Sequence, residues 1–302
     1  MLERLFLILF LLSFCSSVSG LENCKWNNQK GVPCTTISKT PNTSSYNSQG
    51  VNKKIFTRQK IIESGATTAI DVLKKVSGLD YYQTGQKGQQ AAIFMRGSES
   101  NHTLVMLNGI AINDQSATNG LHDFGQDFIQ TVQQVEVYKG PQGSSVGANA
   151  MAGFINMYST QPQENAANRF RVEAGNYGLF NVGIAAGTEF NSDVQGRFSL
   201  NQLTSDGFVE NKTLNKDDTN DINELSFRGL LDVEFNNEVT SQFVLHYFDI
   251  DNGYDAFSLD QDRTTLSDEP GEDKQETLAL GVNTTYTGFE NTDLTVMLSH
   301  SD

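Results

Sequence analysis

The sequence has no long apolar run beyond its first twenty residues, so no membrane-spanning helix is expected. Basic residues are also few: 21 Lys and Arg stand against 36 Asp and Glu, and the formal net charge is −15. Such a surface argues against nucleic acid as a partner, because that affinity depends on neutralising phosphates. It fits a cation-binding surface or a merely solvated one. If the chain enters a lipid bilayer, it must do so as strands, in which only every second residue faces lipid.

Cysteine is scarce as well, with three in 302 residues. Residues 1–20 have the pattern of a secretory signal peptide, with an apolar stretch at Leu5–Phe14 and small residues that place the cut after Gly20. The exported chain would keep Cys24 and Cys34. An even pair predicts a disulfide in an oxidising compartment such as the periplasm, and two free thiols are the alternative.

Two regions of structure are expected after a flexible N-terminal arm at residues 21–52. Residues 53–162 mix helical and strand patterns. One helix is expected from a Thr57 cap through Ile62, and another from Thr67 or Thr68 through Val76, with Gly78 as its stop. Strands are predicted at Lys54–Phe56, Tyr81–Thr84, Ala91–Arg96, Thr103–Leu107, Ile110–Asn113, Val132–Tyr138 and Gly153–Ser159, with Asn108-Gly109 as a hairpin turn.

Residues 163–302 show a period of two. Within Ile222–Phe235 the odd positions from Leu225 onward are nearly all apolar, and the even positions from Glu224 onward are polar, except for Leu230. Short and long connections alternate, as in a transmembrane barrel, while a soluble sheet with one buried face remains open. The other predicted strands are Arg169–Gly175, Phe180–Gly187, Gly196–Leu203, Val239–Tyr247, Thr277–Tyr286 and Thr292–His300, with long loops at Asp206–Asp221 and Asp249–Asp273. About seven strands are too few to close a barrel, which needs about eight, so a C-terminal truncation is expected.

Four motifs carry a resemblance to a known family. They are Ile70–Leu73 with Val76–Leu79, Ile93–Gly97, Leu104–Asn113 and Val135–Pro141. In this order they resemble the plug domain of the TonB-dependent outer-membrane receptors, and most closely the branch that carries cobalamin.

The resemblance implies an α+β plug domain followed by the first strands of an antiparallel transmembrane β-barrel in the outer membrane of a Gram-negative cell. It implies active uptake of a scarce nutrient, cobalamin, in partnership with the TonB complex of the inner membrane, and neither enzymatic activity nor a catalytic cofactor. A siderophore, haem or a glycan is the alternative cargo. The best candidate for the TonB-contacting segment is Thr35–Ser38.

The resemblance also places a cargo site on the plug loops, whose amide and hydroxyl side chains suit hydrogen bonds to an amide-rich ligand. An ordinary exposed loop would have the same composition. The candidate cargo-binding residues are Thr84, Gln86, Gln89, Gln90, Asn113, Gln115, Ser116 and Asn119. Arg96 and Glu136 are candidates for latching the plug to the barrel wall, and an internal salt bridge of the plug is the alternative.

The two long loops of the second region are rich in carboxylates, which repel one another unless they are solvated or bridged by a hard cation such as calcium. The resemblance implies calcium here, because Asp218 and Asp255 match ligand positions of the family branch. The full candidate set is Glu210, Asp218, Asp221, Asp255, Asp268 and Glu269. A solvated acidic loop is the alternative.

A different class of function is suggested by Gly143–Gly147, which matches G-x-S-x-G and could mark a secreted serine hydrolase with Ser145 as nucleophile. A nucleophile elbow needs a helix after the serine, and the small residues that follow fit no long helix. The hydrolase is therefore a remote alternative.

Overall fold

The computed structural model describes residues 52–66, 68–84, 89–114, 119–125, 129, 132–147, 149–162, 167–256 and 262–301. The signal peptide, both exported cysteines and the candidate TonB-contacting segment lie outside these residues, as do Gln86, Gln115 and Ser116. The predicted N-terminal arm lies outside them too, except for its last residue, Asn52, which belongs to a strand. No helix in the described part of the chain is long and apolar enough to cross a membrane.

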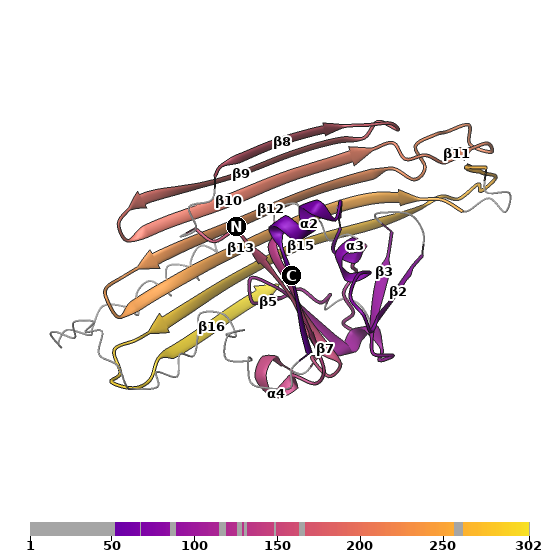
Figure 1. The fold of residues 1–302 in the computed structure, drawn as a ribbon. Coiled ribbons are helices and arrows are strands. Elements are labelled where there is room, and N and C mark those ends of the chain that lie inside the picture. The colour runs from indigo at the N-terminus through magenta and orange to yellow at the C-terminus, as the bar shows by residue number, and fades with distance from the viewer. Residues whose placement is uncertain are drawn as a thin grey trace. The chain divides into compact units, whose positions relative to one another are not determined.

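The first region is built on a five-stranded sheet (Figure 1). Its strand order is β1-β6-β7-β4-β5, in which only β4 and β7 pair in parallel. The strands are β1 (Asn52–Thr57), β4 (Thr103–Leu107), β5 (Ile110–Ala111), β6 (Val132–Lys139) and β7 (Gly153–Ser159). A separate antiparallel pair is formed by β2 (Leu79–Gln83) and β3 (Ala91–Met95). All seven strands predicted for this region are therefore present.

Four short helices lie in the described part of this region, and the first two add buried side chains to its core. They are α2 (Arg58–Glu63), α3 (Ala69–Leu73), the 3-10 helix η3 (Ser100–His102) and α4 (Gly143–Val146). Thr68 and Asp71 form a capping box at the start of α3. The helix ends at Leu73, before the predicted Val76, because turns lead from there to Gly78, whose φ of 79° is the left-handed conformation that glycine favours.

The β4–β5 hairpin has the turn that its sequence predicts. Asn108 and Gly109 have φ values of 50° and 83°, as a two-residue turn of the primed type requires. The Asn108 amide also joins the hairpin to β7, because its Nδ2 donates to Ser159 Oγ (3.0 Å) and its Oδ1 accepts from the Ser159 backbone N–H (2.8 Å). The predicted strand Ile110–Asn113 is shorter than expected, since Asn113 turns back to bond β4.

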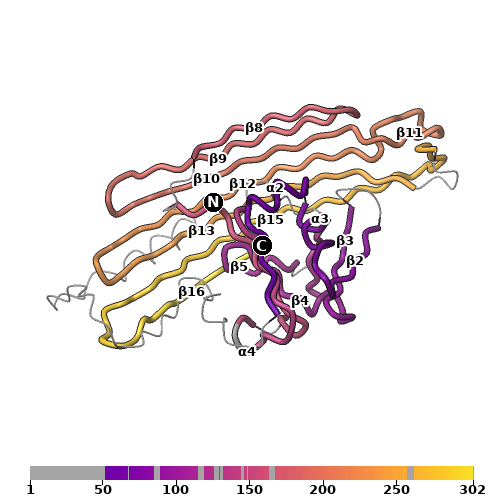
Figure 2. Tube along the Cα trace, in the orientation of Figure 1, coloured from indigo at the N-terminus to yellow at the C-terminus, as the bar shows by residue number. Residues whose placement is uncertain are grey.

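The second region is a seven-stranded antiparallel sheet in which the strands follow chain order from β8 to β16 (Figure 2). Its strands are β8 (Arg169–Ala174), β9 (Phe180–Asn191), β10 (Val194–Ser205), β12 (Ile222–Glu234), β13 (Val239–Tyr254), β15 (Gly271–Tyr286) and β16 (Leu294–Ser301). A two-stranded parallel pair, β11 (Glu210–Asn211) and β14 (Thr264–Thr265), joins its two longest loops. The predicted loop Asp249–Asp273 is shorter than expected, because β13 and β15 stay paired as far as Tyr254 and Gly271.

The polar and apolar faces of this sheet are the reverse of those in a soluble protein. On β12 the even residues, among them Glu224, Arg228 and Asp232, are buried, whereas the odd apolar residues are partly exposed. Large apolar side chains stand exposed along the sheet at Phe170, Phe190, Phe198, Leu200, Phe243, Leu280, Val296 and Leu298. A soluble sheet with one buried face would bury the apolar set. The exposed apolar face indicates lipid as its environment.

Candidate functional site: the plug, its wall contact and the outer loops

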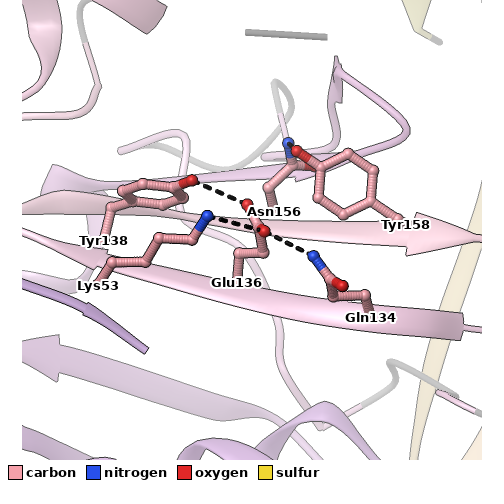
Figure 3. Close-up of polar contacts among 6 residues, drawn as sticks. All are labelled: Lys53, Gln134, Glu136, Tyr138, Asn156 and Tyr158. Carbon is pink, nitrogen blue, oxygen red and sulfur yellow. Dashed lines mark hydrogen bonds and ion pairs between the residues drawn. The ribbon is translucent and has the colours of Figure 1, made fainter. Parts of the chain in front are cut away.

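The most buried charge of the five-stranded sheet is Glu136, which is 1% exposed. Figure 3 shows its polar contacts. Glu136 comes from β6, which lies between β1 and β7, and its partners described below lie on neighbouring positions of the same sheet. Lys53 Nζ on β1 lies 3.0 Å from Glu136 Oε1. Gln134 Nε2 donates to the same oxygen at 2.6 Å, and the Tyr138 hydroxyl donates to Oε2 at 2.9 Å. The carboxylate is thus fully hydrogen-bonded where water cannot reach it.

This cluster bears on the predicted plug-to-wall latch. Glu136 forms its ion pair with Lys53, inside the plug. This is the internal salt bridge that the sequence offered as the alternative to a latch. Arg96 lies exposed in the turn after β3, with φ of 54°. The latch role of Arg96 and Glu136 stays a prediction.

A residue that sequence reasoning overlooked makes an apolar contact between the plug and the seven-stranded sheet, called the wall below. Phe248 of β13 makes another, since it packs against the plug core. Ile110, at the tip of the β4–β5 hairpin, is 2% exposed and packs in one buried cluster with Leu230, Val244 and Ala279 of the sheet. Leu230 pairs with Val244, and Val244 with Gly281, so the contact crosses three adjacent strands in register. We call Leu230, Val244, Ala279 and Gly281 the Ile110 socket. Its sequence signal is Leu230, the one apolar residue among the polar even positions from Glu224 to Glu234.

We expect Gly281→Ala to push the hairpin tip off the wall. A Cβ at Gly281 would lie 2.6 Å from Ile110 Cδ1, closer than van der Waals contact allows. Overpacking of this kind costs about 1–3 kcal/mol. Hydrogen exchange of the β4 and β5 amides should therefore accelerate in the variant. Gly229→Ala is the matched control, because its Cβ would meet its neighbours at ordinary distances of 3.6 Å and more. Equal exchange in the two variants would contradict the socket.

The plug loops that were predicted to hold cargo are shaped by their own hydrogen bonds. Asn113 is buried, and its Oδ1 accepts from the Val105 N–H (2.8 Å) while its Nδ2 reaches the carbonyls of Thr103 and Gly120. Asn113 therefore fixes the loop that follows β5 to strand β4, and its side chain is engaged by the protein's own backbone. The Thr84 backbone N–H and hydroxyl both donate to the Gln90 carbonyl, at 3.0 and 3.2 Å, and close the other loop.

The remaining described candidates differ in exposure. Thr84, Gln90 and Asn119 are exposed, and Gln89 is half-buried. These residues are open to a ligand on two neighbouring loops. Their contact with cargo stays a prediction.

Asp123 ties these two loops together. Its Oδ1 accepts from the backbone N–H groups of Ala91 and Gly125, each at 2.8 Å. Burial raises the pKa of the Asp123 carboxyl above its ordinary value, and Asp273 adds to this, whereas the two backbone bonds and His122 lower it. The burial cost prevails, so the charged form of this carboxyl is less favourable in the folded than in the unfolded state.

Asp123 should therefore contribute less to the stability of the folded loops as pH rises. A carboxyl whose pKa is higher in the folded than in the unfolded state gives up stability as pH rises from its ordinary 3.8 through the raised value. We expect Asp123→Asn, which keeps the acceptor oxygen and removes the charge, to slow exchange of the Ala91 and Gly125 amides at pH 7. At about pH 4 the two proteins should converge. Hydrogen exchange corrected for its intrinsic pH dependence measures this, and parallel profiles would refute it.

The six candidate calcium ligands do not converge. Among the residues that the structure describes, no three His, Cys, Asp or Glu side chains gather closely enough to hold a metal ion. Both oxygens of the buried Asp255 carboxylate already accept hydrogen bonds, from Asn211 Nδ2 (2.8 Å) and from the Ala256 N–H (2.7 Å). Glu210 is paired with Lys212. Calcium takes six to eight oxygen ligands, whereas both of these carboxylates are engaged by protein partners. The calcium site stays a prediction.

Neighbouring carboxylates nevertheless influence one another in these loops. Burial raises the pKa of the Asp221 carboxyl, and the charges of Asp218 and Asp251 raise it further. The backbone N–H groups of Asp221 and Gly253 act in the opposite direction. The acidic character of the loops therefore carries an electrostatic cost at neutral pH.

Comparison with known proteins bears on both regions. Residues 42–154 match the family model of the TonB-dependent Receptor Plug Domain. Over 204 residues the chain is 28% identical to the vitamin B12 transporter BtuB of Vibrio vulnificus strain YJ016, covering 68% of this chain and 32% of the transporter. Over 121 residues it is 36% identical to BtuB of strain CMCP6, covering 40% of this chain and 20% of that one. The chain thus spans a third or less of these relatives.

Solved structures share the fold of both regions. The ferric yersiniabactin uptake receptor FyuA from Yersinia pestis superimposes with a TM-score of 0.68 at 17% identity, over 84% of this chain and 41% of that one. The FpvA receptor of P. aeruginosa, bound to a heterologous pyoverdine, gives 0.64 at 19% identity, over 84% and 34%. At these identities the likeness concerns the fold alone.

Proposed function

Because the chain is a TonB-dependent receptor of the outer membrane, similar to the vitamin B12 transporter BtuB, we propose that it forms part of an active transporter for cobalamin. Energy for uptake would come from the TonB complex of the inner membrane. The observation that carries the transporter role is the wall itself: its apolar face is exposed, its polar face is buried, and the plug hairpin packs against that buried face at Ile110. A domain packed on the polar face of a sheet whose other face is apolar and exposed is the arrangement expected of a plugged membrane barrel.

The choice of cobalamin rests on the two BtuB relatives. The amide and hydroxyl groups of Thr84, Gln89, Gln90 and Asn119 suit the amide-rich periphery of a corrin, since each can donate or accept. A siderophore is the second candidate, because the solved structures of the same fold include receptors for ferric yersiniabactin and pyoverdine. Their low identity favours no cargo over another.

Uptake measurements decide between these cargoes. The complete receptor that contains this chain would be expressed in Gram-negative cells lacking their own cobalamin receptor, with radiolabelled cyanocobalamin as the probe. We expect uptake that is lost when TonB is deleted. Ferric siderophores serve as the parallel probe. Uptake of a siderophore with no binding of cobalamin would overturn the proposed cargo, and uptake of either that persists without TonB would overturn the transport mechanism.

A further inference from the structure

Three loops at one end of the wall are bonded directly to one another. They are the β8–β9 turn around Tyr177, the segment 206–213 after β10, and the segment 262–267 before β15. The Tyr177 carbonyl accepts from the Asp206 N–H (2.9 Å) and from the Ser205 hydroxyl (3.0 Å). The Tyr177 hydroxyl in turn accepts from Arg263 Nη1 at 2.5 Å. The first loop is thus held by both of the others.

The second and third loops are joined as a short parallel sheet. Glu210 pairs with Thr264 and Asn211 with Thr265. The Glu210 N–H donates to the Arg263 carbonyl (2.9 Å), and the Lys212 N–H donates to the Thr265 carbonyl (2.9 Å). Only two residues of each loop pair, and so short a sheet is marginal without side-chain support.

That support comes from Asn211, which is fully buried. Its Nδ2 donates to Asp255 Oδ2 at 2.8 Å and to the Ser267 carbonyl at 2.9 Å, and its Oδ1 accepts from the Leu214 N–H at 2.9 Å. One amide therefore bonds its own loop, the end of β13 and the third loop. Asp255 is 7% exposed, so its bond to Asn211 is sheltered from competing water.

A strained backbone marks the same place. Tyr177 and Arg263 have φ values of 60° and 65°, where residues with a Cβ are uncommon. Both side chains lie beside the Phe208 ring. Arg263 Cζ is 6.0 Å from the centroid of that ring, and the centroid of the Tyr177 ring is 6.2 Å from it. Such conformations persist only where surrounding contacts enforce them.

We propose that Asn211 and Asp255, with the β11–β14 pair, form a clasp that orders the outer loops through protein hydrogen bonds and needs no cation. Asp255 then serves as a structural acceptor and not as a metal ligand. The clasp presents Tyr177, Phe208 and Arg263 as one preassembled surface before any cargo arrives. This is independent of which cargo the receptor carries.

Hydrogen exchange on the complete receptor in detergent tests the clasp. Asn211→Ala should speed exchange of the backbone amides at least about tenfold in both 206–213 and 262–267, because the removed amide joins the two segments. The wild-type pattern should be the same in calcium and in a calcium chelator. Asp217→Ala, an exposed position in the same loop, is the matched control and should leave both segments unchanged.

Two outcomes would overturn the clasp. Chelation that loosens both segments of the wild type to the level of Asn211→Ala would show that a cation orders the loops. Acceleration confined to 206–213 in Asn211→Ala would show that Asn211 does not join the loops. Asp255→Asn adds a separate measurement: the clasp predicts a smaller effect than Asn211→Ala, because one acceptor oxygen remains and the Leu214 and Ser267 bonds are kept.

Discussion

Replacing Lys53 with Met should destabilise the plug by about 3 kcal/mol, because it leaves the Glu136 carboxylate buried without its counter-charge. Lys53 Nζ lies 4.9 Å from the Tyr138 ring centroid. Methionine keeps an apolar side chain of similar length beside this ring, so the measured loss of stability reports mainly the missing positive charge. Hydrogen exchange of the β6 and β7 amides in the detergent-solubilised receptor should accelerate about a hundredfold.

The companion variants separate charge from packing. Glu136→Gln removes the negative charge and keeps an acceptor oxygen for Gln134 or Tyr138, so it should cost less than Lys53→Met. In the double variant Lys53→Met with Glu136→Gln no buried charge is left alone, and most of the lost stability should return. If the double variant were as unstable as the sum of the single ones, the ion pair would have no energetic role.

Gly153→Ala should be at least as damaging to the plug. A Cβ at this position would lie 2.0 Å from the Tyr138 carbonyl oxygen and 2.5 Å from Met95 Sδ, and the Gly153 φ of 153° is one that L side chains rarely adopt. The carbonyl belongs to the neighbouring strand β6 and cannot move without breaking the β6–β7 pairing. We expect a loss of about 3 kcal/mol or more, measured as earlier unfolding of the plug in urea.

Gly143→Ala is the matched control for this variant. Gly143 begins α4, and a Cβ there would meet no atom within 4 Å. Alanine also favours helix over glycine, so the change should be neutral or slightly stabilising. Equal sensitivity of the two positions would contradict the close approach of β7 to β6.

Much of the fold follows from local sequence signals. Thr103–Leu107 and Gly153–Ser159 are strands with the predicted bounds, and Asn108-Gly109 is the predicted turn, because short-range turn chemistry and apolar runs decide these elements. All seven wall strands were predicted from alternation. The lengths of these strands were not predicted. The pairing of β13 with β15, for example, continues through polar residues as far as Tyr254 and Gly271, and it depends on a partner strand that is distant in the sequence.

Site residues could be predicted from the sequence only where a residue type in a given place has one usual role. Glu136 was selected as a charge on a plug strand, but its partner Lys53 lies 83 positions earlier, and only the sheet order brings them together. Acidic residues in the outer loops suggested calcium, yet Asp255 bonds a neutral amide. Nothing in the sequence around Asn211 predicts that its side chain joins two distant loops, because asparagine is common in exposed loops.

The order of strands in the plug sheet has a consequence for how the protein matures. The first strand, β1, pairs with β6, and β6 pairs in turn with β7, which ends at Ser159. A segment emerging from an export channel therefore cannot complete its sheet until roughly a hundred more residues have followed, and contacts so distant in sequence form slowly. If residues 1–20 act as the predicted signal peptide, this late completion would keep the plug extended while it crosses the inner membrane, and folding would follow on the far side.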